Sequence, residues 1–182
     1  MLSTATPAIR GDGSVRPNQI LAVSLHHSML GKDRALRVVE TVRRELLTPL
    51  GLRSLAPSDS RYRPRYEGDV SSRDGAYHQG TVWPWLMGPF ISAYLRASGD
   101  PSAARARCRE WLRAFEQHLQ TAGTGQISEI ADAEPPFTPR GCVAQAWSVA
   151  ELLRVAVEEV REPAAVAPRK RARTRQIAVG AA

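Results

Sequence analysis

The sequence predicts an all-α fold, part of a toroid of helical hairpins with about five helices and long polar loops at one mouth. Apolar residues recur at a spacing of about 3.6 residues in the segments between the loops. Two long segments, 51–79 and 122–140, are instead rich in polar residues, glycine and proline. Because these loops alternate with pairs of helices, we expect both of them on the same side of the fold.

The first two helices are expected between Pro17 and Gly31 and over 32–48. Proline suits the first turn of a helix, because the N–H that it lacks has no partner there. The second segment carries one continuous apolar stripe, which Pro49 and Gly51 end.

Three more helices are expected over 81–97, 102–121 and 142–160. The segment 81–97 is apolar nearly all round, which indicates burial on both sides. Trp111 and Trp147 fall on the apolar stripes of the last two helices, and we expect both of them in the core.

The chain divides into three parts by composition. Residues 1–15 form a lead-in loop, 16–160 form the helical domain, and 161–182 are predicted to be a disordered basic tail. Long loops rich in polar and aromatic residues are functional more often than they are plain connectors. A short strand-like piece, 126–130, lies in the second of them.

Composition excludes several classes of function. The net charge of +7 comes largely from 168–175, so nucleic-acid binding by the folded part has little support. No segment approaches the ~20 apolar residues of a membrane span, and two cysteines favour reduced thiols in a cytoplasmic protein. His26 and His27, expected within the first helix, have no third ligand at metal spacing, and no motif indicates a metal or a cofactor.

Five sequence motifs point to one protein family. They are RPNQ (16–19), YEGD (66–69), AYHQGTVWPWL (76–86), GQISEIAD (125–132) and PRGCVAQAWSVAE (139–151). In this order they resemble the C-terminal end of the amylo-α-1,6-glucosidase domain of glycogen debranching enzymes. The resemblance runs from about Arg16 to Val160.

The resemblance implies an (α/α)6 barrel of six outer and six inner helices, with the sugar site built by loops at its mouth. About five helices are expected here, so the chain would form a C-terminal portion of such a barrel. The implied activity is inverting hydrolysis of the branch-point glucose during glycogen breakdown. The implied partner is an α-glucan, either glycogen or a limit dextrin.

Inverting hydrolysis needs two carboxyl groups, a base and an acid. Glu129 matches the glutamate that the family uses as general base. The general acid of the family is an aspartate in an upstream stretch that this sequence does not contain. Asp69, Asp74 and Asp132 are candidates by residue type alone, so the chain is expected to be inactive by itself.

The resemblance also suggests residues that contact the sugar. Trp83 and Trp85 lie beside a polar loop and suit stacking on a sugar ring, with burial in the core as the alternative. Polar contacts are expected from Tyr77, His78, Asp69, Arg140 and Gln145. Asp69 and Arg140 could equally form an ion pair with each other.

Two alternatives to an active glucosidase stay open. The chain could be a non-catalytic glucan-binding or structural remnant, or it could be completed by another chain that supplies the N-terminal part of the barrel. In half a toroid, the inner face of the helix over 81–97 would be exposed, which predicts poor solubility.

Overall fold

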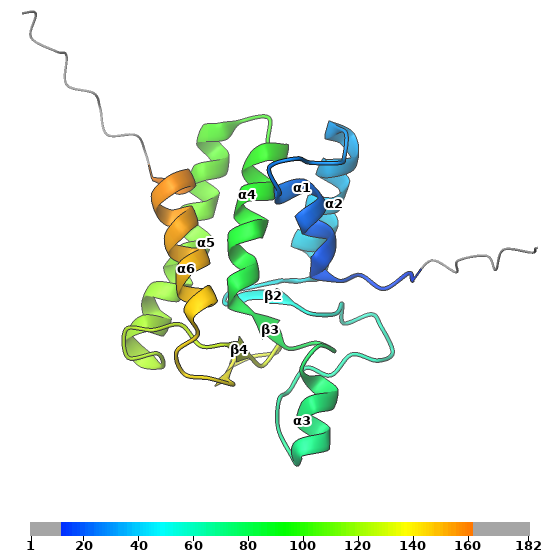
Figure 1. The fold of residues 1–182 in the computed structure, drawn as a ribbon, viewed down its shortest axis with the longest axis vertical. Coiled ribbons are helices and arrows are strands. Elements are labelled where there is room, and N and C mark those ends of the chain that lie inside the picture. Colours follow the sequence, from blue (N-terminus) through cyan, green and yellow to red (C-terminus); the bar gives the residue numbers. More distant parts are fainter. Residues whose placement is uncertain (1–11, 162–182) are drawn as a thin grey trace, which may run out of the picture.

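The computed structural model describes residues 12–161 and is mainly helical, as predicted. Its central element is helix α4 (Met87–Ala97), which stands between two pairs of helices (Figure 1). Helices α1 (Leu21–Ser24) and α2 (Lys32–Glu45) pack on one side of it. Helices α5 (Pro101–Thr121) and α6 (Ala146–Val155) pack on the other side.

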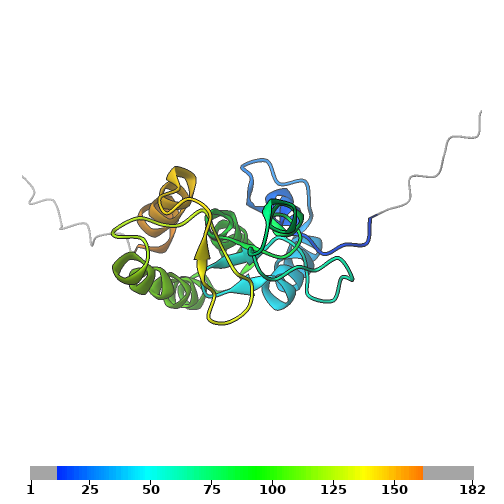
Figure 2. The same cartoon turned by 90° about the horizontal axis from the view of Figure 1, so that it is seen from below.

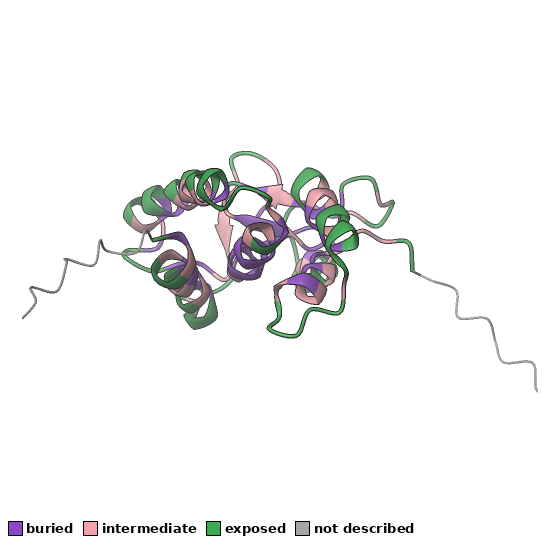
Figure 3. Ribbon diagram, turned by 90° about the horizontal axis from the view of Figure 1, so that it is seen from above, coloured by how far each residue is buried: buried purple, intermediate pink, exposed green. Residues whose placement is uncertain are grey.

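Helix α4 is buried on nearly all its faces, and Arg96 is its only exposed residue. Met87, Phe90, Ile91 and Ala93 have no exposed surface, and viewed from above the helix is almost wholly buried (Figure 3). The expectation that half a toroid would leave this helix exposed is therefore wrong. The reason is that α1 and α2 cover one side of α4, while α5 and α6 cover the other.

The prediction of an all-α fold is wrong in one respect, because one end of the molecule carries a small antiparallel sheet (Figure 2). Its five strands follow each other in chain order. They are β1 (Leu47–Thr48), β2 (Gly51–Arg53), β3 (Val82–Trp83), β4 (Ile130–Ala131) and β5 (Pro139–Arg140). Strands of two or three residues are too short to show an alternating pattern of apolar residues in the sequence.

The sheet joins the two long loops to the base of α4. Strand β3, just before that helix, pairs with β2 through Trp83 and Leu52, and with β4 through Val82 and Ala131. Strand β4 then pairs with β5. Segments that are far apart in the sequence are thereby brought to one end of the molecule.

Several helix boundaries differ from the predictions. The first predicted helix is a 3-10 turn (Pro17–Ile20) followed by the short α1, so His26 and His27 lie in an exposed bend after the helix. The loop over 51–79 contains a helix that was not predicted, α3 (Val70–Ala76).

The predicted helix over 81–97 begins only at Met87, because β3 and a 3-10 turn (Pro84–Leu86) precede it. The last helix begins at Ala146 rather than 142, and it ends in a π-helical turn (Ala156–Val160). The predictions for α2 and α5 agree with the structure closely.

Most of the predicted lead-in loop, and all but the first residue of the predicted basic tail, lie outside the described residues. Within residues 12–161, no helix has the length and the apolar character that a bilayer crossing needs.

Gly51 tests the close approach of β2 to β3. Its φ is +137°, and a Cβ atom there would lie 2.5 Å from the carbonyl oxygen of Trp83. Gly51→Ala should lower the free energy of unfolding by about 1–3 kcal/mol, measured by urea denaturation, because strained backbone is forced on the alanine. The control is Gly75→Ala in α3, where nothing lies within 4 Å of the added atom. Equal losses in the two variants would contradict this account of the sheet.

Candidate functional site

A cavity of about 420 Å³ lies where the start of the described chain, the turn before α4 and the start of α6 meet. This volume falls within the usual range for small-molecule sites. Its lining is mainly aromatic and polar: Arg16, Pro17, Asn18, Ser54, Tyr77, His78, Trp83, Trp85, Leu86 and Trp147. Four of the residues predicted to contact sugar (Tyr77, His78, Trp83 and Trp85) are among them.

The aromatic rings of the cavity form one connected cluster. The His78 ring is stacked on Trp83, with centroids 5.1 Å apart and planes 8° apart. Tyr77 meets Trp83 edge to face at 4.8 Å. Trp83 itself is buried, and its indole N–H donates to the backbone oxygen of Tyr77 at 3.1 Å. Trp83 therefore supports the wall of the cavity, while the exposed His78 and the half-buried Tyr77 face it.

The two tryptophans predicted to be core residues differ in the structure. Trp111 packs against Phe90 and Tyr94, with centroid distances of 5.1 and 4.8 Å, as expected of a core residue. Trp147 is 49% exposed, so its assignment to the core is wrong. The helix begins at Ala146, which leaves Trp147 in its first turn at the mouth of the cavity.

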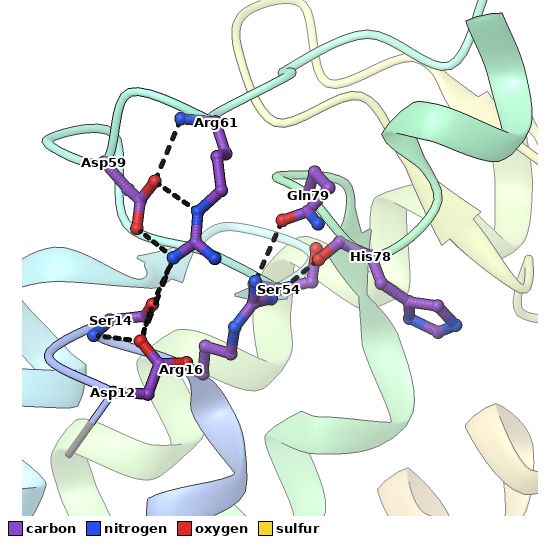
Figure 4. A network of polar contacts seen from close by, with 8 residues as sticks. All are labelled: Asp12, Ser14, Arg16, Ser54, Asp59, Arg61, His78 and Gln79. Atoms are coloured by element: carbon purple, nitrogen blue, oxygen red, sulfur yellow. Dashed lines mark hydrogen bonds and ion pairs between the residues drawn. The ribbon is translucent and has the colours of Figure 1, made fainter. Parts of the chain in front are cut away.

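Arg16 holds the turn that carries the aromatic residues (Figure 4). Its guanidinium group donates to the backbone oxygens of His78 (2.8 Å) and Ser54 (3.2 Å), and to Oε1 of Gln79 (2.9 Å). This role was not predicted, although Arg16 opens one of the sequence motifs. Its partners lie 38 to 63 residues away in the chain, which no local pattern could indicate.

Glu129 is connected to this cavity through Tyr77. The Tyr77 hydroxyl donates to Oε1 of Glu129 at 2.5 Å, and the backbone N–H of Cys142 donates to Oε2 at 3.0 Å. Burial acts to raise the pKa of Glu129, but these hydrogen bonds and one from the Gln145 side chain lower the pKa below its ordinary value. Burial and the nearby carboxylate also raise the pKa of Tyr77, which keeps its hydroxyl a neutral donor.

Gly141 lets the backbone lie against the Glu129 carboxylate. Its φ is +68°, and a Cβ atom at this position would lie 2.4 Å from Oε2 of Glu129. The carboxylate is therefore confined on three sides, by Tyr77, by Gly141 and by the N–H of Cys142.

Three other predicted site residues lie outside the lining of the cavity, namely Gln145, Arg140 and Asp69. Arg140 binds the fully buried Asp132, with Nη2 2.9 Å from Oδ2, and its nearest other carboxylate is Glu67 at 3.8 Å. Asp69 is the N-cap of α3 and accepts from the backbone N–H of Ser72 at 2.8 Å. Asp69 and Arg140 therefore do not form the ion pair that was expected as an alternative, because Arg140 pairs with Asp132 instead.

Acidic side chains are absent from the part of the cavity lining that the structure describes. Between residues 12 and 161, no three His, Cys, Asp or Glu side chains gather closely enough to hold a metal ion. Cys142, whose N–H binds Glu129, and Cys108 are both free thiols, and burial raises the pKa of Cys108 to about 12.

Tyr77→Phe tests the electrostatics of Glu129. Removing this donor should raise the pKa of Glu129 toward or above its ordinary 4.5, which an NMR titration of the carboxyl carbon measures. A lowered pKa in the folded state stabilises the protein above pH ~4.5, and this contribution is lost as pH falls through the folded-state value. The variant should therefore lose less stability on acidification than the wild type. An unchanged titration, equal to that of a Tyr94→Phe control, would contradict this role.

Gly141→Ala tests the confinement of the carboxylate, with Gly125→Ala as a matched control. Both glycines have positive φ (+68° and +84°), so both variants carry similar backbone strain, but nothing lies within 4 Å of a Cβ at Gly125. Only Gly141→Ala should also displace Glu129 and shift its titration. The same NMR measurement on both variants decides, and a matching shift in the control would refute the argument.

The family model described as amylo-alpha-1,6-glucosidase matches residues 3–154. The glycogen debranching enzyme of Saccharomyces cerevisiae (strain ATCC 204508 / S288c) is 35% identical over 89 residues, which cover 46% of this chain and 6% of the yeast protein. The matched region is thus a small part of that relative. Because the family model covers most of the chain, this protein belongs to the amylo-alpha-1,6-glucosidase family.

Proposed function

We propose that this chain supplies the general base and one sugar-binding wall of a glucosidase that removes the α-1,6-linked branch-point glucose of a glycogen limit dextrin with inversion. The observation that carries the proposal is the Glu129 carboxylate. It is kept ionised beside an aromatic cavity, and its orientation is fixed by Tyr77 and by the N–H of Cys142.

In the proposed reaction, Glu129 removes a proton from a water molecule. The water oxygen attacks the anomeric carbon of the glucose from the face opposite the leaving oxygen, so the configuration inverts. The bond between the anomeric carbon and the leaving oxygen breaks, and a carboxylic acid donates a proton to that oxygen. The Tyr77 and Cys142 donors use only part of the hydrogen-bonding capacity of the carboxylate, which leaves lone pairs for the water.

The acid in this proposal comes from outside the described residues. Asp132 is fully buried and bound to Arg140, and Asp69 caps α3. Asp74 lies exposed on α3, and none of these aspartates lines the aromatic cavity. One carboxylate cannot deprotonate water and protonate the leaving oxygen in the same inverting step.

We further propose that other helical segments, in this protein or in another chain, complete an (α/α)6 toroid, and that the complete enzyme acts in the cytoplasm. An open groove of about 850 Å³ between α5 and α6 supports the proposal that other segments pack here. Apolar side chains line much of it, among them Leu112, Phe115, Leu119, Leu152 and Leu153. Leu153 on this groove is 61% exposed, so a further segment packed there would bury its side chain.

A non-catalytic glucan-binding or structural role is the second candidate. It is favoured by the same absence of acidic side chains from the described lining of the cavity. The two functions differ in whether Glu129 does chemistry, so the decisive experiment must not depend on the acid.

α-Glucosyl fluoride provides that experiment, because fluoride leaves without protonation and only the base is needed. The purified chain should hydrolyse it, with β-glucose as the first product by NMR, and Glu129→Gln should lower the rate by about 10²–10⁴-fold. Limit dextrin, which needs the acid, should be hydrolysed far more slowly by the same chain.

The control is Glu40→Gln, a half-buried carboxylate on α2 that pairs with Arg43 and does not line the cavity. Fluoride release that Glu129→Gln leaves unchanged would disprove the role of the base. Absence of release by the wild type would favour the non-catalytic candidate, and α-glucose as first product would exclude inversion.

A further inference from the structure

Trp147 is unusual among the aromatic residues of the protein. It is 49% exposed, and it is the only exposed Trp, Tyr or Phe side chain between residues 12 and 161. Its ring lies 6.0 Å from that of Trp85, with the planes tilted by 34°, and 6.3 Å from the ring of Trp83. Trp85 is half-buried and lines the same cavity.

The position of Trp147 is fixed relative to Glu129. The N-cap of α6 is Gln145, two residues before Trp147, and its backbone N–H donates to the oxygen of Ile127 at 2.8 Å. Three residues before Gln145, Cys142 exchanges two hydrogen bonds with Glu129: its N–H donates to Oε2 at 3.0 Å, and its backbone oxygen accepts from the N–H of Glu129 at 2.9 Å. One short segment therefore holds both the carboxylate and the exposed ring.

Trp85 is held just as firmly. It lies in the 3-10 turn Pro84–Leu86, which follows directly on β3 and packs against α6. Its neighbour Trp83 pairs with Leu52 in the sheet. Two indoles on fixed backbone segments thus line the same cavity, although burial of the exposed ring would stabilise the fold.

We propose that Trp85 and Trp147 form a stacking platform for consecutive glucose units of the α-glucan, beside the glucose that reacts at Glu129. This inference rests on the proposed function and extends it from one sugar to a chain. The C–H face of a pyranose is flat and apolar and suits an aromatic ring. A pair of rings tilted by 34° fits a curved chain, such as an α-1,4-linked segment, better than a flat one.

The polar rim of the cavity is consistent with this ligand. Asn18 is exposed beside the rings, and its amide can both donate to and accept from sugar hydroxyls. Arg16 already binds Ser54, His78 and Gln79, so its donors hold the wall of the cavity in place. A hydroxyl-rich ligand with apolar faces can therefore use both the rings and the Asn18 amide.

The test is calorimetric binding of glucose, maltose, maltotriose and maltotetraose to the purified full chain. Wild-type affinity should rise with ligand length. Trp147→Ala should weaken maltotetraose binding by about tenfold and leave the weak binding of glucose nearly unchanged, because only the longer ligand reaches the platform. Trp147→Phe, which keeps a ring, should recover most of the affinity.

Leu36→Ala is the matched control, because Leu36 is 46% exposed on α2, away from the cavity. Equal maltotetraose affinity of the wild type and Trp147→Ala would overturn the platform while leaving the role of Glu129 intact. A wild-type chain that binds none of the four sugars would overturn both proposals. Circular dichroism of each variant checks that the fold is retained.

Discussion

The backbone pairing of β3 is the constraint on which the rest of the structure depends. The two long loops contain few helices, so their N–H and C=O groups need partners elsewhere. Strand β3 provides them on both sides, through Trp83 with Leu52 and Val82 with Ala131. Since β3 leads through one 3-10 turn into the buried helix α4, the loops are anchored to the centre of the hydrophobic core. Glu129 precedes β4 by one residue, and this pairing brings it to Tyr77.

Two carboxylates three residues apart show how environment separates structural from chemical roles. Asp132 is fully buried and receives N–H donors from Tyr66 and from both Nε and Nη2 of Arg140. A buried carboxylate with a charged partner holds two loops together and is expensive to disturb. Glu129 is only partly buried, and its donors are a neutral hydroxyl and backbone N–H. It is ionised without a cation beside it, as a base that must take a proton requires.

The parts of the fold that could be predicted are those with local causes. Helix α5 has an apolar stripe, an Asp100 N-cap and Pro101 in its first turn, so its limits follow from the sequence. The strands could not be predicted, because two residues carry no periodicity. Helix α3 has no apolar stripe to reveal it. The exposure of Trp147 was missed because a stripe indicates a helical face but not where the helix starts. Four of the ten residues that line the cavity could be predicted, and only because the motifs resemble a known family.

The donors that suit Glu129 for one half of the proposed reaction exclude it from the other half. Hydrogen bonds that lower its pKa keep it deprotonated at neutral pH, whereas a general acid must hold its proton until the leaving oxygen takes it. The second carboxyl group therefore needs the opposite surroundings, with little water and few donors, so that its pKa is raised. The side of the cavity near Trp85 and Trp147 already offers an apolar surface of this kind. A glucan stacked there would exclude water from the acid as well as hold the substrate, so the platform and the raised pKa of the acid would depend on each other.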